Sequence, residues 1–240
     1  MDQRHDRSDK RMRSQGNNSR GNTNGTTMLQ VHAFTFNAFQ EHTYVVYDDT
    51  RDCAIIDPGC YTPQEQAVLS AFIEQHGLRV QHLINTHAHI DHVLGNQYVK
   101  VTYGVKLALH ALDLPTLRLA TQYADRYGFP DYQPTKADLK LEAGDTIQVG
   151  HNRPTVLHVP GHAPGHIALY SAQDKLCLAG DVLFKNSIGR TDLPGGDHAL
   201  LLHSIHQQLF PFWYEVIIYP GHGPSTTIGV EKSCNPHCRL

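Results

Sequence analysis

The sequence predicts an α+β domain in which two mixed β-sheets pack face to face and are flanked by helices. Three observations support this fold class. Segments of strand and helix pattern are mixed along residues 28–240, and the second half of that range repeats the arrangement of the first. Several of the expected strands end in polar residues of functional type. Two sheets covered by helices fit this order of elements, and no linker divides residues 28–240 into separate domains.

In the first half, alternating and β-branched residues predict strands at 29–36, 43–47, 53–56, 80–85 and 105–109. Apolar residues at helical spacing predict helices at 63–76, from about 91 to 103, and at 112–127. Turn residues separate these elements. Asp57-Pro58-Gly59 ends the third strand, and Gly77 and Gly128 end two of the helices.

In the second half, we expect strands at 145–149, 155–159, 167–171, 175–179 and 215–219, and a helix at 198–209. Residues 1–27 differ from the rest because they are rich in Asn, Ser, Gly, Asp and Arg and contain few apolar residues. Such a segment buries too little surface to offset the entropy of ordering, so we expect a disordered tail there.

Composition excludes several classes of protein. The net charge of −3 favours neither nucleic acid nor an anionic membrane surface as a partner. No apolar run approaches the roughly 20 residues of a membrane span. The five cysteines are odd in number and scattered, which favours a reducing cytoplasm over a secreted disulfide framework. The oligomeric state stays open, with a homodimer as one option.

A cluster of histidines is the strongest functional signal. An apolar run ends at Thr86 and is followed at once by His87, His89, Asp91 and His92. Three imidazoles and a carboxylate within six positions, with further ligands expected downstream, are too many for one closed tetrahedral site, and they predict two neighbouring metal sites. Asp91 alone also suits a helix N-cap, but a cap does not account for the histidines beside it.

Further candidate ligands stand directly after predicted strands. His162, Asp181 and His222 each follow a Gly that ends an apolar run. A ligand at the end of a rigid strand is held in place before the metal binds. One Gly-His pair would be an ordinary loop histidine, but three such endings together with the 87–92 cluster predict a metal centre. His166, in the same loop as His162, is interpreted as a residue behind the ligands.

The run Thr86-His87-Ala88-His89-Ile90-Asp91-His92 resembles the signature of the metallo-β-lactamase superfamily, and the other candidates follow in the order of its motifs. The resemblance implies a four-layer αββα sandwich. It implies that the first metal ion is bound by His87, His89 and His162. It implies that the second is bound by Asp91, His92 and His222, with Asp181 bridging both. Asp57 is implied as a residue that supports the ligands through hydrogen bonds.

Within the superfamily, the chain is similar to glyoxalase II-like hydrolases. The similarity is carried by residues 180–184, 187–192 and 219–224. It implies hydrolysis of a thioester such as a hydroxyacylglutathione by a hydroxide that bridges two divalent ions. Asp91 and Asp181 are the implied catalytic residues. Zinc is the expected metal, and this ligand set also accepts iron or manganese.

The substrate is expected to be a small thioester or ester, with a glutathione conjugate as one candidate. Arg190 and Thr191 are the expected substrate-binding residues, because a guanidinium suits a carboxylate and glyoxalase II-like enzymes place a cation there. Arg190 has an alternative partner in Asp192. Asp192 and Gly223 also stand where those enzymes place tyrosines. Two alternative functions therefore stay open, a persulfide dioxygenase with one iron and a hydrolase of another ester or a lactone.

Overall fold

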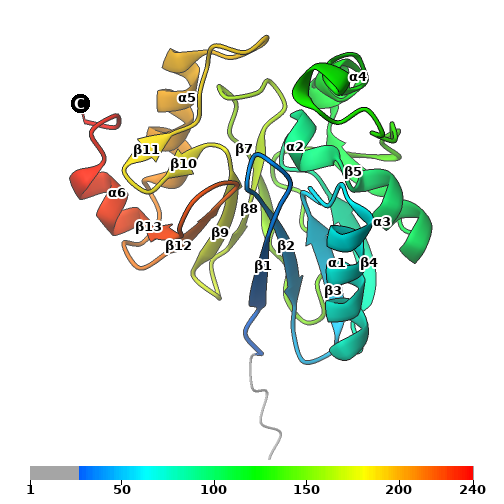
Figure 1. The fold of residues 1–240 in the computed structure, drawn as a ribbon. Helices are drawn as coiled ribbons and strands as arrows, with labels where there is room; N and C mark the ends of the chain where they lie inside the picture. Colours follow the sequence, from blue (N-terminus) through cyan, green and yellow to red (C-terminus); the bar gives the residue numbers. More distant parts are fainter. Residues whose placement is uncertain (1–26, 240) are drawn as a thin grey trace, which may run out of the picture.

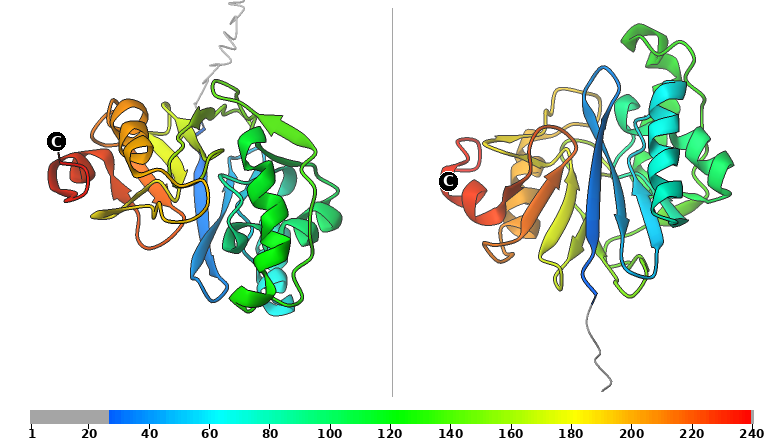
Figure 2. Two further views of the ribbon diagram at one scale, coloured as in Figure 1. Left: turned by 90° about the horizontal axis from the view of Figure 1, so that it is seen from above. Right: turned by 60° about the horizontal axis from the view of Figure 1, so that its bottom comes forward.

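The computed structural model describes residues 27–239, so the predicted disordered tail lies almost entirely outside the described residues. Two β-sheets form the middle of the molecule and helices cover their outer faces (Figure 1). This is the four-layer αββα order that the sequence predicts. Seen from above, helices α4 and α5 lie on opposite sides of the strands (Figure 2). None of the helices within residues 27–239 has the length and apolar character needed to cross a membrane.

The first sheet has six strands in sequential order from β1 to β6. Their bounds are Gln30–Phe36, Glu41–Tyr47, Asp52–Ile56, Arg79–Ile84, Leu107–His110 and Leu139–Leu141. The first three strands pair antiparallel, and β3, β4, β5 and β6 pair parallel. Because the parallel strands are joined by helical crossovers, the chain leaves each of them at the same edge of the sheet, where the histidine cluster lies.

The second sheet has five strands in the order β13-β12-β9-β8-β7. Their bounds, in chain order from β7, are Thr155–His158, Ile167–Ser171, Leu176–Gly180, Ile217–Pro220 and Thr226–Thr227. Strands β9 and β12 are parallel and the other pairs are antiparallel. A separate two-stranded hairpin consists of β10, Leu183–Phe184, and β11, Ser187–Ile188.

Alternation along the strands divides the core into three layers. On β2 and β3, Val45 and Ile55 face the helices, while Val46 and Ile56 face the second sheet. Between the sheets these side chains pack against residues such as Leu178. A period of two sends neighbouring side chains to opposite faces, so both faces of each central strand are apolar. This burial explains why the strands read as continuous apolar runs.

The helices are α1, Pro63–Gln75; α2, Ile90–Val93; α3, Asn96–Tyr103; α4, Leu114–Tyr123; α5, His198–Ser204; and α6, Ile228–Cys234. Helix α1 starts at a capping box, in which the Thr62 hydroxyl accepts from the Glu65 N–H and the Glu65 carboxylate accepts from the Thr62 N–H. Short 3₁₀ turns flank α4 at Ala111–Asp113 and Asp125–Tyr127, and a π-helical turn at Ile205–Leu209 extends α5.

The structure differs from the predicted elements at several places. The strand expected at 145–149 is wrong, because that segment makes only single bridges, Thr146 to Thr155 and Val149 to Asn152, and joins no ladder. The helix expected from 91 to 103 is divided at Gly95, whose N–H donates to the Pro58 carbonyl. An added Cβ at Gly95 would meet the Cys60 sulfur at 2.5 Å, so this close approach requires glycine. Strand β6 and helix α6 were not predicted.

Candidate metal centre

The seven predicted ligands converge at one edge of the two sheets. His87 and His89 lie in the loop after β4, and Asp91 and His92 lie in α2, which follows it. The second sheet supplies the others, His162 after β7, Asp181 after β9 and His222 after β12. All seven therefore follow strands that end at the same edge, although they are spread over residues 87–222 of the chain.

The side chains form two groups of potential ligands. His87, His89 and His162 each offer a nitrogen, and these atoms lie within 4.8 Å of one another. The closest pair is His89 Nδ1 and His162 Nε2, at 2.9 Å. Asp91, His92 and His222 form a second group by the same measure. These are the two sets that the sequence predicts. A third group of potential ligands consists of Asp57, His87 and His92.

Asp181 lies between the two groups. Its Oδ2 is 3.6 Å from His162 Nε2 and 3.5 Å from His222 Nε2. Its Oδ1 is 3.5 Å from His92 Nε2. One carboxylate therefore faces imidazole nitrogens of both groups, as a residue that bridges two cations must.

Hydrogen bonds on the far side of the rings fix which nitrogen faces the site. His162 Nδ1 donates to the Arg190 carbonyl at 2.7 Å, and His222 Nδ1 donates to the Phe39 carbonyl at 3.1 Å. A carbonyl only accepts, so the proton of each neutral ring sits on Nδ1. The Nε2 atom of each ring keeps its lone pair and points toward the carboxylates.

Asp57 supports the centre from behind. Its carboxylate accepts from the Thr86 N–H and hydroxyl and from His92 Nδ1. Since the single Thr86 hydroxyl hydrogen goes to Asp57, the Thr86 oxygen accepts from His87 Nδ1, at 3.1 Å. Although Asp57 lies within ligand distance of His87 and His92, its oxygens are already occupied. We therefore interpret it as the residue that orients these two imidazoles.

Three buried polar atoms of the predicted ligands have no hydrogen-bond partner within the described residues. They are His87 Nε2, His92 Nε2 and Asp181 Oδ1. A buried polar atom without a partner costs about 1–3 kcal/mol, so atoms of this kind are rare in folded proteins. Nitrogen and carboxylate donors of this type suit zinc, iron or manganese. The residues present therefore fit a pair of divalent cations.

The electrostatics differ between the two groups. Burial is the main cause that lowers the pKa of His87, and it lowers the pKa of His89 to about 3. Burial also disfavours the charged form of His92, but Asp91 and Asp181 outweigh it and raise its pKa. The first group is therefore neutral imidazole, the form that binds metal, while the second group is held together by carboxylate charge.

A buried acid that sequence reasoning missed connects two ligand loops. Asp113 Oδ2 accepts from the N–H of Ala88, which lies between two of the histidines, at 2.7 Å. Its Oδ1 accepts from the N–H of Gly165, in the loop of His162, at 2.8 Å. Burial raises the pKa of Asp113 to about 6. Asp113 stands at the N-cap of α4 but makes no capping bond, so its local sequence signal, a helix cap, is misleading.

His166 also lies behind the ligands, as predicted. Its Nε2 accepts from the Asp181 N–H at 3.0 Å, and its ring stacks on that of His87 with centroids 4.6 Å apart. Gly221 lies close to the Asp181 carboxylate, since a Cβ added at Gly221 would lie 2.1 Å from Asp181 Oδ1. Glu41, fully buried 3.9 Å from His92, is a further acid that the sequence reasoning did not single out.

The metal centre forms the floor of a cavity of about 430 Å³. Arg190 is among the residues that line this cavity, whereas Thr191 is not. The Arg190 guanidinium is paired with Asp192 through two bonds of 2.7 Å, from Nε and from Nη2. The alternative partner that the sequence offers for Arg190 is therefore the one it contacts, and substrate binding by Arg190 and Thr191 stays a prediction.

A comparison with protein families identifies the chain. The family model of the metallo-beta-lactamase superfamily matches residues 37–222. The chain belongs to this superfamily. The chain is similar to a hydroxyacylglutathione hydrolase, GloC, of Haemophilus influenzae, which is 35% identical over 87% of this chain and 97% of its own length. The probable metallo-hydrolase YqgX of Bacillus subtilis is 31% identical over 82% of this chain and 92% of its own.

Solved structures of the superfamily share the architecture. The B3 metallo-beta-lactamase BLEG-1 has a TM-score of 0.79 at 34% identity, covering 87% of this chain and 99% of its own. TTHA1623, solved in a di-iron-bound form, has a TM-score of 0.76 at 36% identity, covering 86% of this chain and 99% of its own. The protein is thus a metallo-hydrolase of the superfamily, and its His and Asp groups are suited to divalent metals.

Proposed function

We propose that the protein is a dinuclear metal-dependent hydrolase that cleaves a thioester such as a hydroxyacylglutathione. The observation that carries the proposal is the position of Asp181, whose two oxygens face His92, His162 and His222 at 3.5–3.6 Å. That position supports two cations side by side rather than one. The similarity to GloC, a hydroxyacylglutathione hydrolase, supports the substrate class, and the di-iron form of TTHA1623 supports the metal count.

The ligands of the proposed ions are the two groups described above, with Asp181 shared. When bound, two divalent ions lower the pKa of water to about 7 and polarise a carbonyl oxygen, which is what ester and thioester hydrolysis requires. Zinc is the proposed metal, with iron or manganese as alternatives. The chain's own residues hold these donors in place before a substrate arrives.

Asp91 is the proposed proton carrier. It lies at the cavity floor, and its Oδ2 is 3.1 Å from His222 Nε2. A carboxylate there can accept a hydrogen bond from the attacking water, orient it toward the carbonyl and relay its proton. The thiolate released from a thioester is a good leaving group, so the scheme needs no strong general acid.

Metal analysis combined with a hydrolysis assay tests the proposal. The protein is reloaded with zinc, iron or manganese, and the metal content and the hydrolysis of S-lactoylglutathione are measured on the same samples. For the wild-type protein we expect two ions per chain and thioester turnover. In Asp181→Asn we expect both the two-ion occupancy and the turnover to be lost. The matched control is Asp174→Asn, a buried carboxylate that accepts from Leu29 N–H and lies away from the centre.

Three outcomes would contradict the proposal. Two bound ions without turnover of any thioester would favour another ester or a lactone as substrate. One iron per chain together with oxygen uptake on glutathione persulfide would favour the dioxygenase alternative. Full metal content and full turnover in Asp181→Asn would show that Asp181 does not bridge the ions.

A further inference from the structure

The cavity above the metal centre is largely apolar. Its floor consists of His89, Asp91, His162, Asp181 and His222, the predicted ligands that reach it. Most of the other lining side chains are aliphatic or aromatic. A cavity of about 430 Å³ is large enough to enclose more than the reacting carbonyl, since ligand sites in proteins usually measure about 300–1,000 Å³.

Helix α4 supplies one apolar wall. Thr116, Leu119, Ala120 and Tyr123 line the cavity at spacings of three and four residues, so they share one face of the helix. Tyr127, one turn beyond, continues this wall. The opposite face of an amphipathic helix normally meets solvent, and here the exposed Arg118 of α4 lies outside the cavity. The face turned to the metal centre is thus the apolar one.

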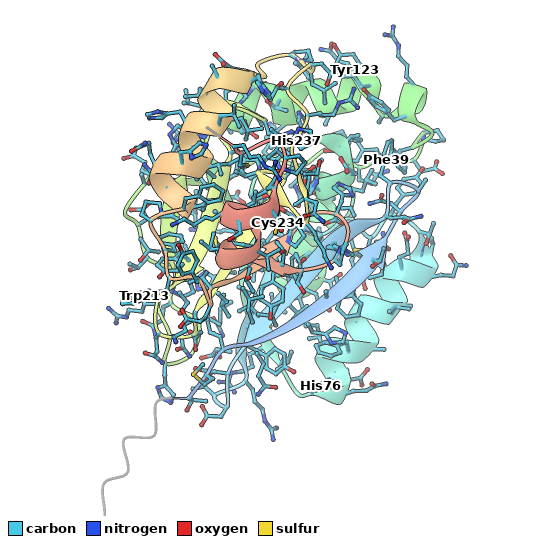
Figure 3. All side chains as sticks on the ribbon, turned by 90° about the vertical axis from the view of Figure 1, so that its left-hand side faces the viewer. Phe39, His76, Tyr123, Trp213, Cys234 and His237 are labelled. Atoms are coloured by element: carbon cyan, nitrogen blue, oxygen red, sulfur yellow. The ribbon has the colours of Figure 1, made fainter. Side chains whose placement is uncertain are left out.

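The loops of the second half and the first hairpin complete the enclosure. Phe184, Ile188, Leu193 and Pro194 line the side opposite α4. Phe39, at the tip of the β1–β2 hairpin, lies at the rim and packs edge to face with Tyr127, with ring centroids 5.9 Å apart. In Figure 3, Phe39 and Tyr123 are labelled toward the same end of the molecule. Both aromatic rings are partly exposed, as rings that contact a ligand are.

The cavity offers little to a charged ligand. Arg190 is the only Lys or Arg among the residues that line it. Its Nε and Nη2 both donate to Asp192, and its side chain is 61% exposed. Away from the ligands at the floor, the lining therefore has no Lys or Arg that is not already paired with a carboxylate, and burying a carboxylate between the apolar walls would be costly.

From these observations we propose that the apolar walls bind the acyl group of the substrate, and that this group is a hydrocarbon chain or ring rather than a short hydroxyacyl group. The inference rests on the proposed thioester hydrolysis. It places the scissile carbonyl at the metal floor, the acyl group between α4 and the Phe184 side, and the thiol portion toward the exposed mouth near Arg190.

The size of the expected effect follows from burial of methylene groups. Each buried methylene contributes about 0.8 kcal/mol, which corresponds to roughly a fourfold change in an equilibrium constant or in kcat/KM. From a two-carbon to a six-carbon acyl group, the expected gain is therefore on the order of 250-fold, until the cavity is full. The lactoyl group gains less because its hydroxyl loses water without a matched partner.

Two measurements on the full chain test the inference. The first is kcat/KM of the metal-loaded protein for S-acetyl-, S-butanoyl-, S-hexanoyl- and S-lactoylglutathione, which share one thiol. The second is calorimetric binding of S-methyl-, S-butyl- and S-hexylglutathione, thioethers that cannot be hydrolysed. We expect both kcat/KM and affinity to rise about fourfold per methylene. We expect the rise to be blunted in Leu119→Ala and kept in Leu112→Ala, an exposed leucine outside the cavity.

The two measurements separate the inference from the proposed function. Thioester turnover without a dependence on chain length, or a preference for the lactoyl group, would overturn the inference and leave the hydrolase intact. Thioether affinity that rises with chain length in the absence of any thioester turnover would support the apolar subsite and refute the proposed reaction. Equal affinity for all three thioethers would overturn the inference whatever the turnover.

Discussion

Replacing Asp113 by Ala should weaken metal binding although Asp113 is not a predicted ligand. The carboxylate accepts from Ala88 N–H at 2.7 Å and from Gly165 N–H at 2.8 Å. One of these donors lies between His87 and His89, and the other lies in the loop of His162. The substitution removes the only side chain that holds both of these ligand loops through hydrogen bonds within the described residues.

The magnitude follows from these two bonds. A hydrogen bond to a charged group contributes about 1.5–3 kcal/mol, so the pair is worth roughly 3–6 kcal/mol. Burial raises the pKa of Asp113 from 3.8 to about 6. This pKa already includes the two bonds, so desolvation of the ionised carboxylate outweighs them, and the substitution removes the desolvation cost together with the bonds. The free energy of unfolding should therefore fall by less than the roughly 3–6 kcal/mol of the two bonds, whereas metal affinity should fall about 10- to 100-fold, as for other residues that orient ligands.

The assay is competition between the protein and a chromophoric chelator for zinc, with denaturant unfolding of the metal-free protein alongside. Asp138→Ala is the matched control, because its carboxylate also accepts a strand N–H, from Leu107 at 2.9 Å, but contacts no ligand loop. Wild-type zinc affinity in Asp113→Ala would refute the reasoning. So would an equal loss in the Asp138 control, since it would show that any lost backbone contact has the same effect.

Three further predictions concern other parts of the molecule. Gly221→Ala should lower zinc affinity at least about tenfold, because the new Cβ would lie 2.1 Å from Asp181 Oδ1. The far-ultraviolet circular dichroism spectrum should stay unchanged. Unchanged zinc affinity would show that the loop of Gly221 adjusts freely. Asp192→Ala should free Arg190 to bind the substrate and so lower KM for glutathione thioesters. The decrease should be at most about fivefold, because an exposed ion pair contributes at most about 1 kcal/mol. KM for uncharged N-acetylcysteamine thioesters should not change. Of the five free cysteines only Cys234 is exposed, and burial raises the thiol pKa of the other four. One thiol per chain should therefore react with a disulfide reagent at pH 8 in the native protein, and all five should react in guanidinium. More than one reactive thiol in the native protein would contradict the burial.

Much of the fold was predictable because its signals are local. The strand at 167–171 and the helix at 63–76 are bounded by turn residues and have their own periodicity. In the structure, the bounds of both elements lie within one residue of the prediction. The strand expected at 145–149 failed for the opposite reason. Whether an extended segment joins a ladder depends on a partner strand, and that partner is not encoded in the segment itself.

The candidate centre divides in the same way. Which residues offer metal ligands could be predicted from the sequence, because imidazole and carboxylate chemistry belongs to the residue and the spacing of His87 to His92 is local. The packed fold was needed to show that Asp181 faces both groups, that Asp113 joins two ligand loops instead of capping α4, and that Arg190 pairs with Asp192. These are contacts between side chains whose directions are set by packing of the two sheets, and a residue's local sequence does not specify where its side chain meets a distant one.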